Sequence, residues 1–203
     1  MLTNLAQQPA DALLALIKIH NNDQRPTKID LGHGDYKTGQ GETPVFGAVK
    51  EAERRLVASQ ESKAYLGPEG DMGFVEALMP YVFGAANPDM DGRIEGMQTP
   101  GGTGSLRLAL ALVKKAEVPT VWMGTPSWPD HAHICADLGL GMKNFSHAGA
   151  DGSADMDALR AAIAEAAEGD CFLLHGCCHN PTGIDYSNAD WDEIAGLIAA
   201  KKL

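Results

Sequence analysis

The sequence predicts an α/β fold in which helices cover a largely parallel β-sheet. From about residue 46 onward, stretches with the 3.6-residue periodicity of helices alternate with short apolar runs bounded by glycine, proline or asparagine. This alternation is typical of parallel sheets. The chain has 203 residues, of which 44% are hydrophobic, so it can bury a sizeable core.

The first 45 residues follow a different pattern. A helix is expected at 12–20, then a polar link at 21–27 and an extended segment at 28–31 that runs into Gly32 and Gly34. We therefore expect an N-terminal arm and the start of a small domain at 1–44, followed by part of a larger domain at 45–203.

Helices and strands then follow in turn along the larger domain. The expected helices span 45–58, 70–83, 105–115, 130–138, 155–167 and 188–201, and the expected strands span 120–123, 142–145 and 171–175. Ser105, Asp155 and Asn188 stand at helix starts as capping residues. Ligands of open α/β sheets gather beyond the carboxyl ends of the strands, so the turns there are the expected site.

Charge and composition exclude several classes of partner. The formal net charge is −11, and no cluster of lysine or arginine offers a surface for nucleic acid or an anionic membrane. Signal-peptide features are missing, and no apolar run approaches the roughly 18 residues of a spanning helix, so a cytoplasmic location is expected. The four cysteines form no disulfide framework, and we expect reduced, mostly buried thiols.

A glycine-rich segment, QTPGGTGSLR at 98–107, opens one of the expected helices. Backbone N–H groups at a helix start, reinforced by the helix dipole, can bind a phosphate. The segment lacks the Gly-Lys-Ser/Thr of a P-loop and the spacing of a dinucleotide motif. Phosphate binding and an ordinary glycine turn are equally compatible with these residues alone.

The turn GTPSWPDH at 124–131 follows an expected strand and carries Trp128 and His131. The indole ring could stack on a planar cofactor, although a tryptophan that anchors the turn in the core is the commoner case. Ser127 lies outside any G-x-S-x-G motif, which argues against a serine hydrolase.

The segment LHGCCHNPTG at 174–183 ends the last expected strand. Its histidines and cysteines are potential metal ligands, but adjacent ligands in an extended turn reach one ion poorly, and no second pair has metal-site spacing. The Asn180-Pro181 peptide is a candidate cis turn that holds the Asn180 amide at the strand end, with a plain turn as the alternative. The Tyr65 hydroxyl lies in a loop and could reach a ligand, although a surface tyrosine is commoner.

Six motifs in this order resemble the class I, fold-type I aminotransferases that depend on pyridoxal 5'-phosphate, in the branch of the aspartate and aromatic amino-acid enzymes. They are IDLGHGDYK at 29–37, TPV at 43–45, YLGPEG at 65–70, QTPGGTG at 98–104, PSW at 126–128 with His131, and HGCCHNPTG at 175–183. The resemblance covers nearly the whole chain as the N-terminal half of such an enzyme. It implies a three-layer α/β/α fold, here truncated before completion.

The resemblance implies roles for residues of the larger domain. Gly101, Gly102 and Thr103 correspond to the cradle of the cofactor phosphate. Trp128 corresponds to the ring beside the cofactor and the substrate carboxylate, and Asn180 to the donor that meets the pyridine 3-oxygen and lies beside the substrate.

Further roles follow from the same resemblance. His131 is similar to the histidine that supports the aspartate under the pyridine nitrogen, and His175 belongs to the same neighbourhood. Gly34 corresponds to a backbone contact with substrate. Tyr65 resembles the tyrosine that reaches the cofactor phosphate of a neighbouring subunit, which implies a homodimer.

The implied reaction is a ping-pong transamination between an L-amino acid, aspartate or aromatic, and a 2-oxo acid, with the cofactor as electron sink. His33 and Asp35 flank Gly34 where the family has apolar residues, which tilts the expectation toward a neutral or aromatic substrate.

The lysine that such enzymes bond to the cofactor is missing from the sequence. No lysine stands in a Ser-x-Ser-Lys context; the candidates considered are Lys63, Lys114, Lys115, Lys201 and Lys202. We therefore assign no catalytic residue, and expect the 203 residues alone to be an inactive fragment that binds cofactor weakly or not at all.

Two other classes compete with the aminotransferase. One is a non-catalytic remnant, a phosphate- or partner-binding module that keeps half of the same fold. A nicotinamide oxidoreductase needs an acidic residue about 20 positions after the glycines, and residues 121–125 contain none.

Overall fold

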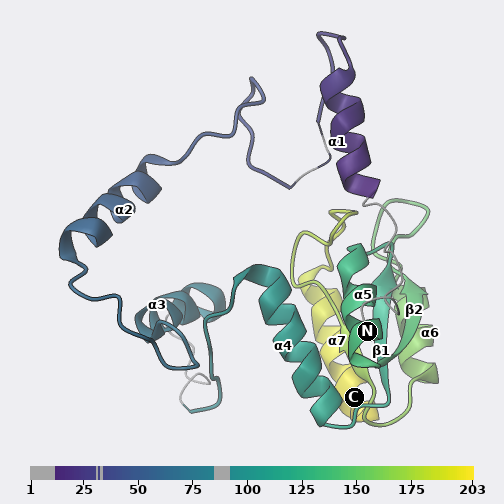
Figure 1. Ribbon diagram of the computed structural model, residues 1–203. Helices are drawn as coiled ribbons and strands as arrows, with labels where there is room; N and C mark the ends of the chain where they lie inside the picture. Colours follow the sequence, from purple (N-terminus) through teal and green to yellow (C-terminus); the bar gives the residue numbers. More distant parts are fainter. Residues whose placement is uncertain (1–11, 31, 33, 85–91) are drawn as a thin grey trace, which may run out of the picture. The chain divides into compact units, whose positions relative to one another are not determined.

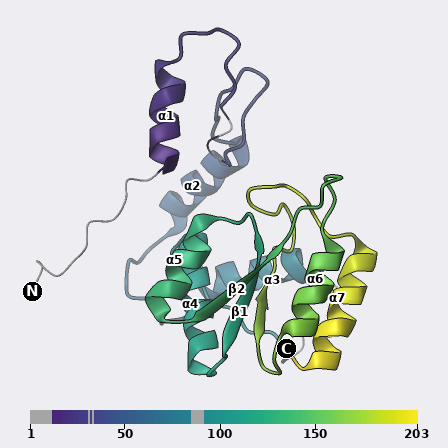
Figure 2. The ribbon, with the colours of Figure 1, turned by 90° about the vertical axis from the view of Figure 1, so that its right-hand side faces the viewer.

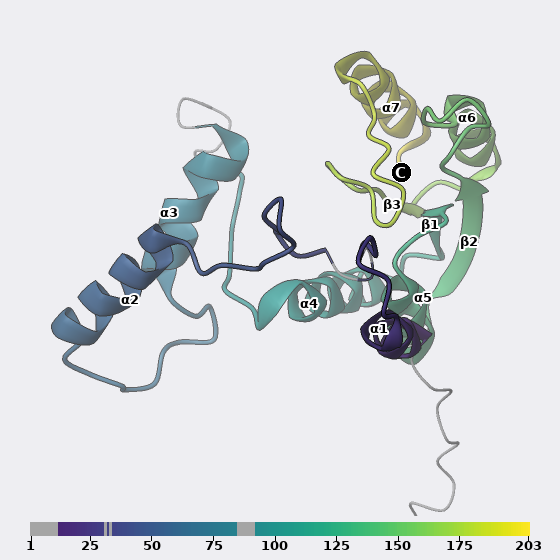
Figure 3. The same ribbon diagram turned by 90° about the horizontal axis from the view of Figure 1, so that it is seen from above.

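A three-stranded parallel sheet lies in the second half of the chain. The structure is a computed structural model, which describes residues 12–30, 32, 34–84 and 92–203. Its strands are β1 (Thr120–Thr125), β2 (Gly141–Ser146) and β3 (Cys171–Leu173), in the order β2-β1-β3 (Figure 3). Val121 of β1 lies opposite Met142 of β2 on one side and opposite Cys171 of β3 on the other. The predicted α/β class with a parallel sheet is confirmed.

Four helices cover the two faces of this sheet. They are α4 (Gly101–Lys115) and α5 (Pro129–Leu138) on one face, and α6 (Met156–Glu165) and α7 (Asn188–Lys201) on the other (Figure 2). Successive side chains of a strand point to opposite faces, so each strand contributes to both layers of core. The result is the three-layer α/β/α arrangement.

The alternation is visible in neighbouring residues of β1. Val121 is fully buried in the cluster with Leu110 of α4 and Ile134 of α5. Trp122 packs on the opposite face, where its ring stacks on Phe172 with 5.7 Å between ring centroids. Burial of apolar surface on both faces, at roughly 25 cal/mol per Å2, holds the sheet between its helices.

Capping residues fix where α6 and α7 begin. The Asp155 carboxylate accepts a hydrogen bond from the Ala158 backbone N–H (2.9 Å). Ser187 forms a capping box with Asp190 at the start of α7. The bounds of α7 agree with the prediction, but its cap is Ser187 and not Asn188, because Ser187 has the extended backbone that a cap requires.

Other bounds differ from the prediction by a few residues. α4 begins at Gly101, four residues before Ser105, so the glycines form the first turn of the helix. The helix α3 (Met72–Phe83) begins two residues later than expected, because Asp71 caps it by accepting from the Phe74 N–H. β3 ends at Leu173, which leaves His175 in the turn beyond it.

The chain divides into two compact units, Met1–Tyr65 and Leu66–Leu203. The first contains α1 (Ala12–Asn22) and α2 (Gly47–Ser59) (Figure 1). Lys28 to Asp30 have no regular secondary structure, and Leu31 and His33 lie outside the described residues. No helix in the described part is long and apolar enough to cross a membrane.

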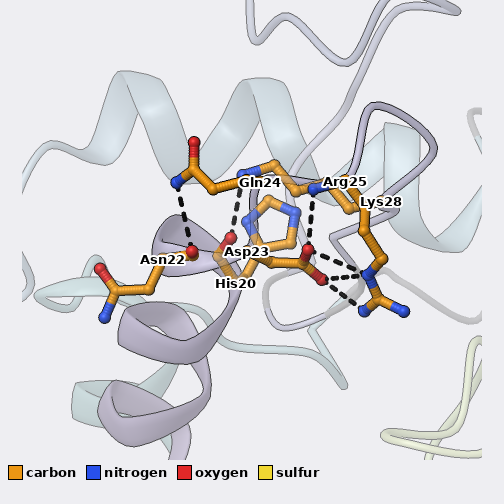
Figure 4. Close-up of polar contacts among 6 residues, drawn as sticks. All are labelled: His20, Asn22, Asp23, Gln24, Arg25 and Lys28. Carbon is orange, nitrogen blue, oxygen red and sulfur yellow. Dashed lines mark hydrogen bonds and ion pairs between the residues drawn. The ribbon is translucent and has the colours of Figure 1, made fainter.

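Polar contacts close the end of α1 in the first unit (Figure 4). The Asp23 carboxylate accepts from the Arg25 backbone N–H (2.9 Å) and from its Nε, which holds the pKa of Asp23 below its usual value. The Lys28 ammonium donates to the His20 carbonyl (2.9 Å), which is one of the last carbonyls of the helix. Asp23 and Lys28 therefore fix the start of the following link.

Candidate functional site

A cleft of about 620 Å3 lies at the carboxyl ends of the strands. Three separate segments line it: the start of α4, the turn after β1 and the turn after β3. Its lining residues are Gly102, Thr103, Ser105, Leu106, Ala109, Trp128, His131 and Asn180. The structure thus brings three of the predicted motifs together where ligands of parallel α/β sheets gather.

The first turn of α4 forms one side of the cleft. Gly101 has φ +70°, a backbone conformation that favours glycine, and so begins the helix. A Cβ on Gly104 would lie 2.8 Å from Pro100 Cδ, whereas a Cβ on Gly102 would meet nothing within 4 Å. Gly102 therefore leaves open space over the helix start, where free N–H groups attract an anion.

Trp128 and His131 come from the turn after β1 and the first turn of α5. The Trp128 ring lines the cleft, meets the His131 ring edge-on at 5.3 Å between centroids, and belongs to neither buried cluster. The commoner case, a tryptophan in the core, is therefore wrong here. The Ser127 hydroxyl lies 2.8 Å from His131 Nδ1 and fixes the orientation of that ring.

Four histidine rings, called the histidine stack below, form a continuous row from the cleft into the protein. His131 meets His175 edge-on, and the His175, His179 and His147 rings lie face to face. The centroid separations are 5.1 Å for His131 and His175, 4.1 Å for His175 and His179, and 3.5 Å for His179 and His147. His131, His179 and His147 are buried. The stack therefore connects the turns after all three strands.

Hydrogen bonds fix the tautomers of three of these rings. His179 Nε2 must donate to the Pro126 carbonyl (3.0 Å) and His147 Nε2 to the Ile184 carbonyl (2.8 Å), because a carbonyl only accepts. The Asn180 backbone N–H donates to His175 Nδ1 (2.9 Å), which leaves the proton of a neutral His175 on Nε2. His175 Nε2 and His179 Nδ1 are buried without a hydrogen-bond partner among the described residues.

The surroundings of the stack favour neutral rings. Burial lowers the pKa of His175 to about 4, and neighbouring histidines add to this effect. Burial likewise lowers the pKa of His131 and of His179. Tyr186, whose hydroxyl lies 3.1 Å from His147 Nδ1, has its pKa raised to about 12, chiefly by burial. The neutral forms of His131, His175 and His179 are therefore favoured near neutral pH.

The remaining predicted site residues do not line the cleft. Gly101 precedes the lining residue Gly102, and His175 packs against His131 behind the lining. Gly34 and Tyr65 belong to the first unit and are exposed there, Tyr65 completely. The Asn180-Pro181 peptide is cis, in agreement with the candidate cis turn.

Several residues of the site were not predicted from the sequence. Ser105, Leu106 and Ala109 follow Gly102 at intervals of three, four and seven residues, so they share its face of α4. That spacing could have identified them. His147 and Tyr186 come from distant parts of the chain, and no local pattern marks them.

Two cysteines also differ from the prediction. Cys135 is buried and Cys171 is partly buried, but Cys177 and Cys178 are exposed in the turn after β3. The expectation of mostly buried thiols is therefore wrong for this pair. Among the described residues, no group of three or more potential ligands could hold a metal ion.

Comparison with known proteins finds aminotransferases that match most or all of the chain. Residues 26–203 match the family model "Aminotransferase class I and II". A tyrosine aminotransferase of Rhizobium meliloti (strain 1021) is 46% identical over 204 residues, which cover 100% of this chain and 52% of that protein. An aspartate aminotransferase of Escherichia coli (strain K12) is 41% identical over 99% of this chain and 52% of its own length.

A solved aminotransferase structure has a similar fold over the whole chain. The crystal structure of an aromatic amino acid aminotransferase from Burkholderia cenocepacia J2315 matches with a TM-score of 0.93 and 34% identity, over 100% of this chain and 52% of the other. The chain spans about half the length of the relatives that it matches. It belongs to the class I and II aminotransferases, in the branch that contains the aspartate and aromatic amino-acid enzymes.

Proposed function

We propose that the cleft at the carboxyl ends of the strands is the binding site for pyridoxal phosphate in a transamination between an L-amino acid and a 2-oxo acid. The observation that carries this proposal is the meeting of an anion-binding helix start, an aromatic ring and an asparagine in one cleft of about 620 Å3. That set fits a planar aromatic phosphate. The open space over Gly102 gives the phosphate room to approach the helix start.

Each side of the cleft then has its own task. Gly101, Gly102 and Thr103 bind the phosphate through N–H groups at the start of α4. Trp128, which lines the cleft, would pack beside the cofactor ring and exclude water from it. Asn180 donates a hydrogen bond to the ring oxygen. When bound, pyridoxal phosphate supplies an electron sink for the bond changes at the substrate α-carbon.

His131 acts as a positioning residue in this proposal. Its ring is held by Ser127 on one side and by His175 on the other. Burial lowers its pKa, so the neutral ring can take part in a hydrogen bond without adding a cation beside the pyridine nitrogen. We propose that this ring supports the carboxylate that pairs with that nitrogen.

The reacting amine comes from elsewhere in this proposal. No lysine is among the residues that line the cleft in the described part of the chain. We therefore propose that these residues anchor the cofactor, and that the lysine of the family is supplied from outside them. We expect the 203 residues alone to bind cofactor weakly and to lack transaminase activity.

Substrate and assembly are proposed on two further grounds. The relatives named above are tyrosine, aspartate and aromatic amino-acid aminotransferases, and Asp35 beside Gly34 would repel a second carboxylate, so we favour an aromatic or neutral amino acid. The complete exposure of Tyr65 leaves its hydroxyl accessible to the phosphate of a second subunit, as a homodimer would require.

The experiment is an NMR titration of the chain with pyridoxal phosphate and, separately, with inorganic phosphate. NMR detects millimolar binding, which corresponds to about −4 kcal/mol. The amide signals of Gly102 and Thr103 should shift saturably with both ligands. Gly102→Leu should abolish these shifts, since the side chain would occupy the space of the phosphate.

Gly196→Leu is the matched control for this substitution. Gly196 is a helical glycine of α7 with open space around its Cβ, distant in sequence from the cleft motifs. This variant should bind both ligands as the parent chain does. Shifts confined to other segments, or equal loss of binding in both variants, would overturn the proposal.

A further inference from the structure

The exposed pair Cys177 and Cys178 has no role in the proposed cofactor site. Both residues lie in the turn after β3, and both are exposed. The two residues are adjacent in the chain, so their thiols project from neighbouring Cα atoms of the same turn. Cys178 has φ +50°, which bends the chain at this point. The turn therefore presents two adjacent thiols to solvent.

Hydrogen bonds fix the turn on both sides of this pair. The Asn180 N–H donates to His175 Nδ1 (2.9 Å) and closes the turn across the two cysteines. The buried His179 ring donates to the Pro126 carbonyl (3.0 Å). The cysteines thus stand at the exposed tip of a turn whose base belongs to the histidine stack.

We propose that Cys177 and Cys178 form a reversible redox site, which closes into a disulfide between adjacent residues by exchange with a small-molecule disulfide such as oxidised glutathione. Two thiols of the protein are oxidised and one external disulfide is reduced to two thiols, so the electrons balance. The chemistry is ordinary thiol–disulfide exchange and needs no other reactant.

The exchange has two steps. The Cys177 thiolate attacks one sulfur of the external disulfide, forms a mixed disulfide and releases one thiol. The Cys178 thiolate then attacks the Cys177 sulfur, forms the bond between the two residues and releases the second thiol. The second step is intramolecular, because the two thiols belong to adjacent residues of one turn.

Adjacency makes the disulfide easy to reduce again. Neighbouring Cα atoms are about 3.8 Å apart across a trans peptide, whereas disulfides usually join Cα atoms roughly 4.4–6.8 Å apart. A bond below that range is strained, and strained, exposed disulfides are the labile ones. The site is therefore suited to a switch rather than to a structural crosslink.

Closure also acts on the cleft, and this part of the inference rests on the proposed function. The new ring would change the backbone at Cys178, two residues before Asn180. The turn is closed by the contact between Asn180 N–H and His175, so a shift at the tip reaches the Asn180 amide. We expect the oxidised chain to bind pyridoxal phosphate several-fold more weakly than the reduced chain.

The test exposes the folded chain to oxidised glutathione and follows its intact mass. The expected product has lost two hydrogen atoms, retains no glutathione, and returns to the reduced mass with dithiothreitol. Cys178→Ser should stop at the mixed disulfide. The double variant Cys135→Ala/Cys171→Ala, which keeps only the exposed pair, should still close completely.

Two outcomes would overturn the redox site: stable glutathione on the parent chain, or unchanged loss of two hydrogens in Cys178→Ser. Phenylarsine oxide provides a second measurement, because it bridges two adjacent thiols and releases water. It should protect both thiols of the double variant from a thiol reagent, and failure to do so also counts against the site.

Cofactor binding is then measured separately on the reduced and the oxidised chain, with the His175 ring nitrogen signals as the readout of the cleft. Closure of the disulfide without any change at His175 would overturn the coupling alone. Binding of phosphate at Gly102 is read in the same samples, so a failure of the proposed function is distinguishable from a failure of the switch.

Discussion

The imidazole rings of His147 and His179 stack with 3.5 Å between their centroids and 9° between their planes. Each ring donates its Nε2 proton to a different backbone carbonyl, so both rings have fixed orientations. His179 in turn stacks on His175, whose Nδ1 accepts the N–H of Asn180. The orientation of the Asn180 backbone in the cleft is therefore fixed by a buried stack of aromatic rings.

This stack predicts a loss of stability in acid. The pKa of His175 is lowered to about 4 by burial and by neighbouring histidines, whereas an unfolded histidine titrates near 6.5. The folded state therefore binds fewer protons between these values, and its stability is complete above about 6.5 and falls as the pH drops toward 4. The groups that face the stack are Asp130, Asp185 and Tyr186.

The measurement is the free energy of unfolding from urea denaturation at several pH values. His175→Asn keeps an acceptor near the position of Nδ1 and removes the titrating ring, so its stability should fall less steeply between pH 6.5 and 4. His133→Asn is the control, because the His133 side chain is 75% exposed. Equal slopes in the parent and in His175→Asn would contradict the prediction.

The buried contact between Asp170 and Trp122 of β1 predicts that two substitutions of Asp170 differ in their effect on stability. Asp170 is buried, and its Oδ2 accepts from Trp122 Nε1 (2.9 Å) and from the Ala167 N–H (3.0 Å). Asp170→Asn keeps an oxygen for both donors, whereas Asp170→Ala leaves both without a partner. We expect Asp170→Ala to cost about 2–4 kcal/mol, and Asp170→Asn to cost much less.

Denaturant unfolding of the two variants measures this difference. Trp122→Phe is the complementary change, because it keeps an aromatic ring against Phe172 and removes only the donor. It should cost roughly 1–3 kcal/mol, with part of that cost abolished in the background of Asp170→Ala. Additive effects of the two substitutions would show that the hydrogen bond contributes nothing.

Two helical glycines should respond in opposite directions to alanine. Gly101 has φ +70°, which an L-residue adopts only with strain, so Gly101→Ala should lose about 1–2 kcal/mol of unfolding free energy. Gly196 lies in the interior of α7 with open space at its Cβ, and Gly196→Ala should gain roughly 0.5–1 kcal/mol. Thermal unfolding of both variants checks the signs, and a stabilised Gly101→Ala would contradict the conformation of the α4 start.

Local signals in the sequence determine most of the fold. The bounds of α7 could be predicted because apolar spacing and a polar cap coincide at its start. The start of α4 could not, because adjacent glycines suggest a turn, and only Gly101 among those at its start has a positive φ. The start of the helix also leaves no room for a side chain at Gly104, where a Cβ would lie 2.8 Å from Pro100 Cδ.

The candidate site was predictable only in part, for a similar reason. Trp128 and Asn180 stand in turns after strands, where parallel topology concentrates ligands. Most contacts of the histidine stack join residues far apart in the sequence, such as His147 with His179, His147 with Tyr186 and His179 with Pro126. No local pattern encodes such contacts. The exposure of Cys177 and Cys178 likewise has no signal in the local sequence.

The phosphate and the ring of the proposed cofactor contact different elements, so their binding should be separable. Asn180→Leu removes the amide that would meet the ring oxygen and leaves the α4 start unchanged. We expect it to weaken pyridoxal phosphate about tenfold, the loss of one hydrogen bond of about 1.4 kcal/mol, and to leave inorganic phosphate unaffected. Asn144→Leu, on an exposed position of β2, is the control. Equal weakening of both ligands by Asn180→Leu would mean that the substitution disturbs the turn as a whole, whereas unchanged binding of both would remove Asn180 from the cofactor site.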